Sequence, residues 1–325
     1  MGRPRAWAFR FGLLATCLAI GLRFQVGADW QAYELQFEAA RNTGLSRLLA
    51  TGDPGYQLLN WAVQQVGGGF WLVNLLCAAA FTWGLNRFAR VQPDPWLTVL
   101  IAIPYLVTVV AMGYTRQSVA IAFILAGLAA MDRGASQLRF ALAIAAAAMF
   151  HKTAVLVLPL AIVAGPRIRV LNALAAIACA VVLYWFFLAS SVEDFFRNYV
   201  DTSYASEGAT VRLAMGAAAA ALFLVLPAGL GFTAQLRRLY LPFSLASLAA
   251  LASLIFLASS TAVDRLALYL LPLQLAVLPR VQFLLRRRQA GRLFVILYCF
   301  AVQYVWLTYA AHADYWIPYR AHPLP

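Results

Sequence analysis

Charged side chains are scarce in this sequence, and lysine is almost absent from it. Only 11% of the 325 residues are charged, and Lys152 is the only lysine. An ordinary soluble domain carries roughly 25% charged residues. A soluble globular domain, a disordered chain and a coiled coil each need more polar surface than these residues provide, so all three classes are excluded.

Sequence motifs for metals, nucleotides and disulfides are also missing. The four cysteines (Cys17, Cys77, Cys179 and Cys299) each lie in an apolar stretch without a CxxC or Cys/His partner, which indicates structural thiols. There is no Walker motif, no GxGxxG after a strand, no HExxH and no GxSxG. We therefore expect neither a cofactor nor a metal site, and an ATP-driven pump is disfavoured.

Apolar residues, in contrast, are abundant. They make up 63% of the chain, and the mean hydropathy is +0.76. Because apolar stretches recur along the whole sequence, we predict an all-α polytopic integral membrane bundle of about eleven segments, in a single domain over residues 1–325. The stretches lie at 6–26, 70–86, 96–114, 117–131, 138–150, 153–165, 170–190, 211–232, 240–258, 264–284 and 293–311.

Four of these stretches are too short, or almost too short, to cross the membrane completely, since a helix rises only about 1.5 Å per residue. They form two adjacent pairs of short, broken helices, which meet at residues 114–117 and 150–153. Each pair is either a tilted hairpin or a structure whose tip stops at a wet cavity. Non-helical backbone at membrane depth must be covered by protein or water.

Arginines and acids alternate between successive connections. Arginines occupy every second connection, and ten of the twelve acids lie in the connections between them. By the positive-inside rule, the arginine-rich connections face the cytoplasm. This predicts a cytoplasmic N-terminus, outer loops at about 27–69 and 190–210, and an outer C-terminal tail at 312–325. The net charge of +13 then reflects membrane orientation rather than nucleic-acid binding.

Several basic residues break this alternation. Arg116, Lys152 and Arg265 lie at predicted outer ends of segments, and Arg320 lies in the outer tail. They could snorkel to outer headgroups and form local ion pairs, as the position of Asp264 beside Arg265 allows. Alternatively, the first three line one outward-facing cavity whose positive charge binds an anion. We favour the cavity, because arginine suits phosphate through its planar fork of donors.

Arg116 is the strongest candidate among them. The nearest acids in the chain, Asp94 and Asp132, belong to predicted cytoplasmic connections. A substrate, or a distant carboxylate such as Asp29 or Asp264, should therefore compensate its charge.

His151 and Asp29 are candidate proton acceptors, each with a structural alternative. A lone histidine is often only a packing residue, but a neutral imidazole beside Lys152 could act as a general base near pH 7. Asp29 and Tyr33 lie four residues apart on an amphipathic stretch that is expected to lie along the outer surface. They either cap and anchor this stretch or contact a sugar. The aromatic cluster at 314–320 is either an interfacial belt or a lid.

Six short motifs follow one another along nearly the whole chain. They are GADWQAY (27–33), DPGY (53–56), TRQSVA (115–120), FHKTA (150–154), Asp264-Arg265 with Tyr269, and PYR (318–320). In this order they resemble the EpsG family, membrane proteins of bacterial exopolysaccharide loci that are similar to Wzy-type polysaccharide polymerases. The chain departs from the family at Asp53, where glutamate is common, but it keeps a carboxylate.

The resemblance implies an activity. Such polymerases join oligosaccharide repeat units carried on undecaprenyl pyrophosphate, at the outer (periplasmic) face of the bacterial inner membrane. Arg116, Lys152 and Arg265 would stabilise the leaving pyrophosphate. His151 or Asp29 would accept the proton of the attacking hydroxyl. The other residues implied to bind substrate are Gln117, Asp264, Tyr33, Asp53, Tyr269 and Arg320.

The implied partners are the lipid-linked oligosaccharide, the bilayer and a chain-length regulator protein, and no cofactor is implied. Two alternatives stay open. A ligase of the O-antigen type would transfer a finished chain by similar chemistry. A lipid-linked oligosaccharide flippase or transporter could also use a basic cavity. Charge spaced through the membrane depth would favour transport, whereas a one-sided outer cluster favours the enzyme.

Overall fold

The computed structural model describes residues 3–50, 52–164, 208–256 and 260–323, together with five isolated positions between 165 and 207. Every regular element in these ranges is a helix, and a single bridge pairs Arg23 with Ala321. The all-α prediction is therefore confirmed for the described part of the chain.

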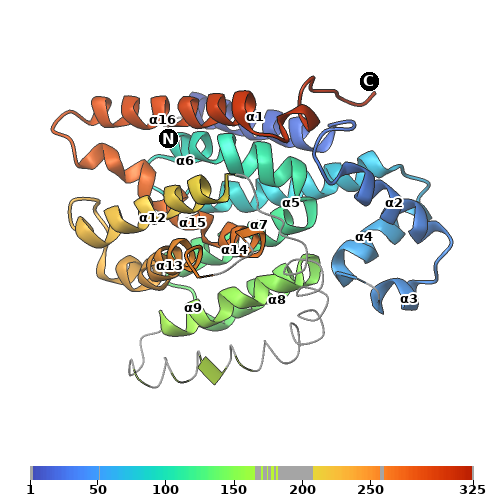
Figure 1. Cartoon of the computed structure of the whole chain (residues 1–325), viewed down its shortest axis with the longest axis horizontal. Helices are drawn as coiled ribbons and strands as arrows, with labels where there is room; N and C mark the ends of the chain where they lie inside the picture. The colour runs from blue at the N-terminus through green and yellow to red at the C-terminus, as the bar shows by residue number, and fades with distance from the viewer. Residues whose placement is uncertain are drawn as a thin grey trace.

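The first half of the chain forms a group of long helices and a separate group of short ones. The elements are α1 (Arg3–Gly21), α2 (Trp30–Arg41), α3 (Leu45–Ala50), α4 (Pro54–Gln65), α5 (Phe70–Ala89), α6 (Pro95–Ala102), the π-helix η1 (Ile103–Ala111), α7 (Thr115–Asp132), α8 (Gln137–Phe150), the 3-10 helix η2 (Lys152–Val157) and α9 (Leu158–Val163). Figure 1 shows α2, α3 and α4 gathered at one side of the bundle.

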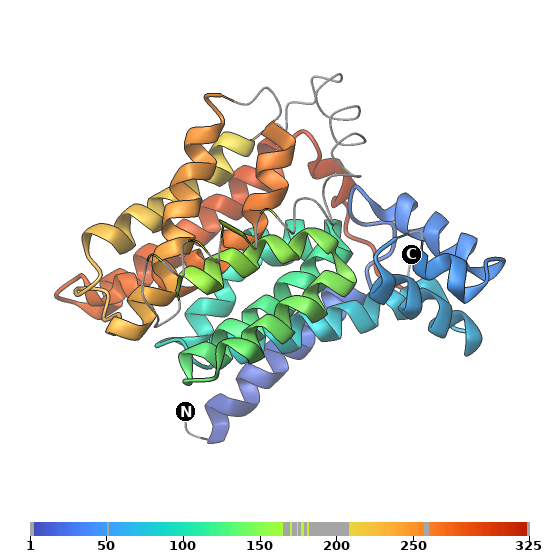
Figure 2. The ribbon, with the colours of Figure 1, turned by 90° about the horizontal axis from the view of Figure 1, so that it is seen from below.

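The second half adds helices on the opposite side. They are α12 (Ala209–Val225), α13 (Ala234–Ser253), α14 (Ser260–Ala267), η4 (Leu268–Leu270), α15 (Leu271–Val277), η5 (Leu278–Phe283), α16 (Arg288–Tyr309) and η6 (Ala313–Tyr315). In Figure 2 this group, yellow to red, lies beside the green and cyan helices, with the blue group of α2 to α4 at the far side.

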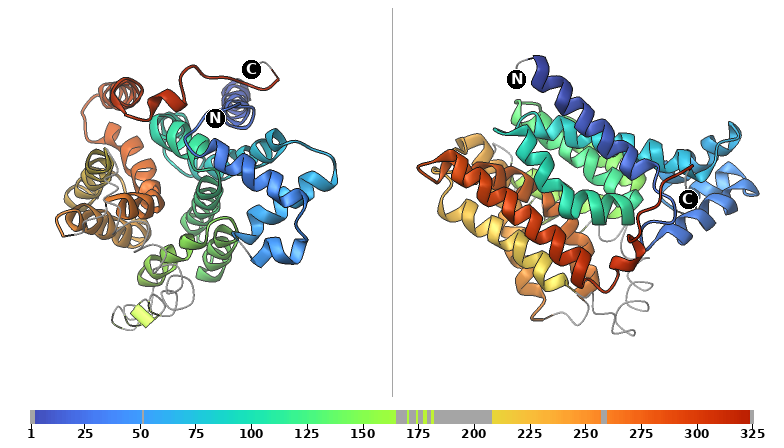
Figure 3. Two further views of the ribbon diagram at one scale, coloured as in Figure 1. Left: turned by 45° about the vertical axis from the view of Figure 1, so that its right-hand side comes forward. Right: turned by 90° about the horizontal axis from the view of Figure 1, so that it is seen from above.

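Helix α7 forms the centre of the core. It packs against α5 on one side and α8 on another, and α5 in turn packs against α1. Its residues Val119, Ile121 and Leu125 are fully buried. A helix that is apolar around its whole circumference is stable only when neighbours cover it on all sides. The left view of Figure 3 shows the cyan and green helices between the blue and orange groups.

The apolar stretches of the sequence coincide with helices, apart from 170–190, which falls outside the described residues except for isolated positions. Two described helices, Ser260–Phe283 and Arg288–Tyr309, are long and apolar enough to cross a membrane by themselves. Four shorter apolar helices run over Ala6–Gly21, Pro95–Ala111, Gln137–Phe150 and Ala209–Val225. The number of crossings stays a prediction.

The two predicted broken pairs have different structures. In the second pair, α8 has 14 residues and ends at Phe150. His151, whose backbone is extended, comes next, and η2 and the six-residue α9 follow. In the first pair, α7 has 18 residues and is therefore longer than the stretch 117–131 suggested. The helix can begin at polar Thr115 and Arg116 because Thr115 accepts a hydrogen bond from Arg23 and Arg116 pairs with Asp53. A hydropathy pattern does not include such contacts.

One face of α16 is apolar and exposed. Phe294, Leu297 and Phe300 expose 60%, 58% and 68% of their surfaces. A contiguous apolar face of this kind is typical of contact with lipid or with another protein. Together with the apolar helices, it is consistent with a membrane protein.

Some of the alternating connections meet at the two ends of α7. At its C-terminal end, the Met131 carbonyl accepts a hydrogen bond from Gln235, and Asp94 pairs with Arg292 at 2.8 Å. These residues belong to predicted cytoplasmic connections. At the other end of α7, Arg116 pairs with Asp53 of a predicted outer loop.

Candidate functional site

Two glycines allow the short helices α2 and α4 to approach the bundle closely. Gly27 has a φ of +107°, and a Cβ there would lie 2.4 Å from the Met112 carbonyl oxygen. A Cβ on Gly55 would lie 2.9 Å from the Met149 carbonyl oxygen. Any other residue would therefore push α2 away from the start of α7, or α4 away from the end of α8.

Asp53 links three separate elements at this end. It lies just before α4 and is 6% exposed. One carboxylate oxygen, Oδ2, accepts from Arg116 Nη1 at 2.8 Å, and the other, Oδ1, accepts from the backbone N–H of Lys152 at 3.0 Å. The distant carboxylate that compensates Arg116 is thus Asp53, not Asp29 or Asp264. Although it is shorter than glutamate, the aspartate side chain reaches both partners.

Arg116 is enclosed by aromatic rings. Its guanidinium carbon lies 5.5 Å from the ring centroid of Tyr33 and 5.9 Å from that of Tyr56. Both tyrosines are buried. Its Nε is buried and has no hydrogen-bond partner among the described residues. The ion pair with Asp53 therefore does not use every donor of Arg116.

His151 is hydrogen-bonded to two hydroxyl groups. Its Nδ1 lies 2.7 Å from Thr153 Oγ1 and 2.9 Å from the Tyr269 hydroxyl, and these two oxygens lie 3.0 Å apart. The extended backbone of His151 turns the chain between α8 and η2, which brings Thr153 back to the ring. The hydroxyls hold Nδ1 and leave Nε2 for another partner.

Gln117 and Arg265 meet across the bundle. Gln117 Nε2 donates to the Arg265 carbonyl oxygen at 2.7 Å, and the Arg265 guanidinium lies 5.0 Å from the Tyr114 ring centroid. The contact joins the start of α7 to α14. It places two predicted site residues from distant parts of the chain in one cluster.

Asp29 and Asp53 are carboxylates in partly dry surroundings. Burial raises the pKa of Asp29, and the positive charges of Arg265 and Arg116 oppose this rise. Burial likewise raises the pKa of Asp53, against the charge of Arg116 and the hydrogen bond from the Lys152 backbone. Asp29 thus lies within electrostatic range of two of the predicted cations.

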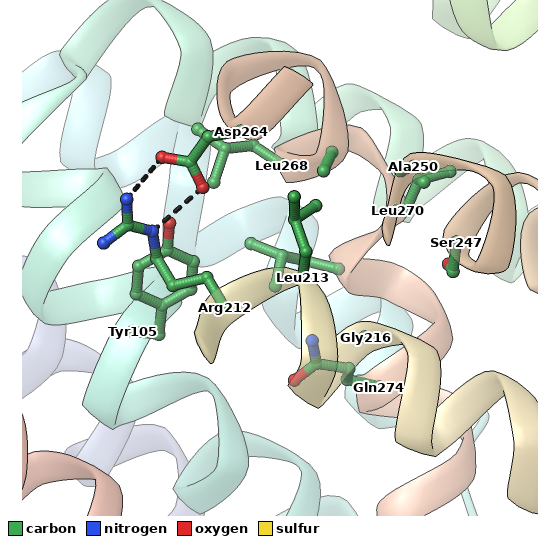
Figure 4. Close-up of a pocket in the computed structure, with 12 residues that line it drawn as sticks. Tyr105, Arg212, Leu213, Gly216, Ser247, Ala250, Asp264, Leu268, Leu270 and Gln274 are labelled. Atoms are coloured by element: carbon green, nitrogen blue, oxygen red, sulfur yellow. Dashed lines mark hydrogen bonds and ion pairs between the residues drawn. The ribbon is translucent and has the colours of Figure 1, made fainter. Parts of the chain in front are cut away.

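Asp264 is held by an arginine that the sequence analysis did not single out. Arg212 of α12 contacts both carboxylate oxygens of Asp264, at 2.9 and 2.6 Å (Figure 4). Tyr105 lies against the same guanidinium, whose carbon is 6.0 Å from the ring centroid. Arg212 also lies at a predicted outer end of an apolar segment, so the signal that identified Arg116 could have identified it too.

Arg23 is a second residue that the sequence analysis missed. It is 1% exposed, and it donates to Thr115 Oγ1 at 2.7 Å and to Asn74 Oδ1 at 3.2 Å. Through Thr115 it fixes the residue next to Arg116. Its position, as a basic residue at the end of the first apolar stretch, is the sequence feature that could have identified it.

Arg320 does not join the cluster through any described contact. Its side chain is exposed and donates to Gln25 Oε1 at 3.2 Å. The tail instead packs on neighbouring elements: Trp316 Nε1 donates to the Thr108 carbonyl oxygen, and the Tyr315 carbonyl oxygen accepts from the Gly27 N–H.

A cavity of about 520 Å³ opens beside Arg116, between α2, α3 and α4. Among the described residues, no three His, Cys, Asp or Glu side chains gather as a metal-ligand set. The cluster instead combines cations, a hydroxyl-bound imidazole and two carboxylates. Such a set can bind an anion and accept a proton.

Comparison with known proteins gives one match. The model of the EpsG family matches residues 6–321, which is nearly the whole chain. No curated protein and no solved structure matches it. The matched region includes every residue of the cluster described above, and the chain belongs to the EpsG family.

Proposed function

We propose that this protein is a membrane glycosyltransferase that polymerises oligosaccharide repeat units linked to undecaprenyl pyrophosphate. The observation that carries the proposal is the junction at Asp53, where Arg116, the Lys152 backbone and the short helix α4 meet beside His151. Membership of a family associated with exopolysaccharide synthesis supports the substrate class.

The reaction needs positive charge at the leaving pyrophosphate and a proton acceptor at the attacking hydroxyl. A hydroxyl of the acceptor sugar attacks the anomeric carbon of the donor, forming a C–O bond while the bond to the pyrophosphate oxygen breaks. Arg116, Lys152 and Arg265 stabilise the negative charge of the departing lipid pyrophosphate. His151 or Asp29 accepts the hydroxyl proton. The activated donor supplies the driving force, so the step consumes no nucleotide.

The distribution of charge favours an enzyme over a transporter. Between Arg116 and Asp132, α7 carries no ionisable side chain, although it runs through the centre of the core. A transport path would need polar groups through the membrane depth. We place the Asp53 end at the outer face of the inner membrane and the Asp94 end in the cytoplasm, in line with the positive-inside rule.

A deletion strain tests this function against its alternatives. Lipid-linked and surface polysaccharides should be separated on gels, with the wild-type gene restored as control. Loss of the chain-length ladder with single repeat units retained at the outer face is the expected result. Full-length polymer that accumulates on its lipid carrier would indicate a ligase. Loss of all lipid-linked material from the outer face would indicate a flippase.

A further inference from the structure

Arg23 is a buried cation whose described partners are all neutral. It is 1% exposed. It donates to the carbonyl oxygens of Ile20 and Val26 at 2.6 and 3.2 Å, and to Thr115 Oγ1 and Asn74 Oδ1 at 2.7 and 3.2 Å. None of these partners is a carboxylate. Burying a charge without an opposite charge beside it is costly, so the position of Arg23 calls for a reason other than stability.

Local capping explains only two of these contacts. The Ile20 carbonyl is one of the last carbonyls of α1, which any basic side chain nearby can cap, and Val26 is only three residues away. The contact with Thr115, in contrast, joins Arg23 to the first turn of α7. The positive end of a helix dipole disfavours a cation there. The end of α1 could be capped without this contact.

The long-range contacts of Arg23 meet around Arg116. Thr115 is the first residue of α7 and directly precedes Arg116. The guanidinium carbon of Arg23 also lies 5.7 Å from the ring centroid of Trp30. Trp30 packs in one buried cluster with Tyr33 and Tyr56, the two rings that flank Arg116. Arg23 therefore contacts both the helix that carries Arg116 and the aromatic cluster that encloses it.

Arg23 is itself firmly held. Its backbone pairs with Ala321, and the N–H of the next residue, Phe24, donates to the Arg320 carbonyl oxygen at 2.9 Å. Its partner Asn74 is fully buried on α5, which packs against both α1 and α7. Because the anchor is fixed from several sides, its hydrogen bond to Thr115 restricts where α7 begins.

We infer that Arg23 is a positioning residue of the proposed active site. Through Thr115 and Trp30 it holds Arg116 in the orientation in which the guanidinium meets the leaving pyrophosphate. Arg23 acts through Arg116 and does not touch the substrate itself. A misplacement of about 1 Å at a reacting group can cost roughly a hundredfold in rate. This inference rests on the proposed function.

The test removes the hydroxyl at Thr115 and leaves the other contacts of Arg23 in place. Polymer formation is measured with full-length protein in nanodiscs, using the repeat unit on undecaprenyl pyrophosphate extracted from the deletion strain. Thr115→Val should lower the rate per folded molecule about tenfold. Thr115→Ser keeps the hydroxyl and should stay within about twofold of the wild type. Thr98→Val, at a buried threonine that bonds to the Asp94 carbonyl oxygen at the start of its own helix, is the matched control.

A second background separates positioning from folding. In Arg116→Lys the fork that Arg23 orients is gone, so adding Thr115→Val should change the remaining rate by less than about twofold. A purely structural effect would lower the rate equally in both backgrounds, and that result would overturn the inference. A Thr115→Val protein with the wild-type rate per folded molecule would overturn it as well, whatever its abundance.

Binding of undecaprenyl pyrophosphate without sugar gives a measurement that does not need the reaction. Thr115→Val should weaken this binding several-fold when Arg116 is present and less than about twofold in Arg116→Lys. If the wild type forms no polymer, the polymerase assignment fails and this binding decides the inference. A loss that depends on Arg116 would support it, and equal binding by wild type and Thr115→Val would overturn it.

Discussion

Two arginines near the same end of the bundle each pair with a buried aspartate, but their surroundings differ. Arg212 contacts Asp264 through two hydrogen bonds and faces a space of about 20 Å³, room for little more than one water molecule. Arg116 contacts Asp53 through one nitrogen, keeps its buried Nε without a described partner, and borders a cavity of about 520 Å³.

The difference separates an ion pair that stabilises the fold from one that is positioned to contact substrate. The Arg212–Asp264 pair fixes α12 to α14, which carries Arg265, whose carbonyl oxygen in turn holds Gln117. Arg116 binds its aspartate through one nitrogen and borders open space. We expect substitutions at the first pair to lower the amount of folded protein and substitutions at the second to lower the rate.

The largest effect is expected at Arg116. Arg116→Lys keeps the charge but loses the planar fork, and removing a charged hydrogen bond to a buried partner costs roughly 2–5 kcal/mol. Polymer formation should fall on the order of a hundredfold or more while membrane abundance stays normal. Polymer ladders and membrane levels should be measured side by side. Arg292→Lys, in the half-exposed pair with Asp94, is the control and should behave as wild type.

Arg116→Ala could also act by leaving Asp53 buried without a cation. The double variant Asp53→Asn with Arg116→Ala separates the two effects, because it removes both charges. It should restore abundance without restoring polymer. Normal polymer from a well-expressed Arg116→Ala strain would remove this arginine from the mechanism.

The next effect is expected at His151. Loss of a general base lowers rates by about a hundredfold or more, so His151→Ala should leave traces of polymer at normal protein levels. Tyr269→Phe removes one of the two hydroxyls at Nδ1 and should cost less, about tenfold at most. If Asp29→Asn abolishes polymer and His151→Ala does not, Asp29 is the base.

A smaller effect on the rate is expected at the Arg212–Asp264 pair. Breaking one partner of a buried pair costs about 3–5 kcal/mol of stability. Arg212→Ala and Asp264→Asn should therefore reduce membrane abundance several-fold, while turnover per folded molecule stays within about twofold. A well-expressed Asp264→Asn protein without activity would show that this pair also takes part in the reaction.

No effect is expected from chelation. Asp53 and Asp264 each bind an arginine, and cations of the chain can stabilise the leaving group themselves. Polymerisation in vitro should proceed equally with and without EDTA. Activity that stops in EDTA and returns with Mg²⁺ or Mn²⁺ would refute this expectation.

The sequence by itself determined the helices and the two ends of the bundle. Runs of apolar residues form helices wherever backbone groups must be satisfied internally, and the alternation of arginine with acid sorted the connections into two groups. It also singled out Arg116, Lys152 and Arg265, because each stands where this chain otherwise keeps its acids.

Only the tertiary structure decided which charges meet. Asp53 lies 63 positions from Arg116, and Arg212 lies 52 positions from Asp264. No local pattern selects Asp53 over Asp29 as the partner of Arg116. Nor does one select Arg212 over Arg265, the sequence neighbour of Asp264, as the partner of Asp264. An ion pair depends on which segments the packing brings within side-chain reach. The cavity between α2, α3 and α4 has the same origin, because helices far from α7 in the sequence supply its walls.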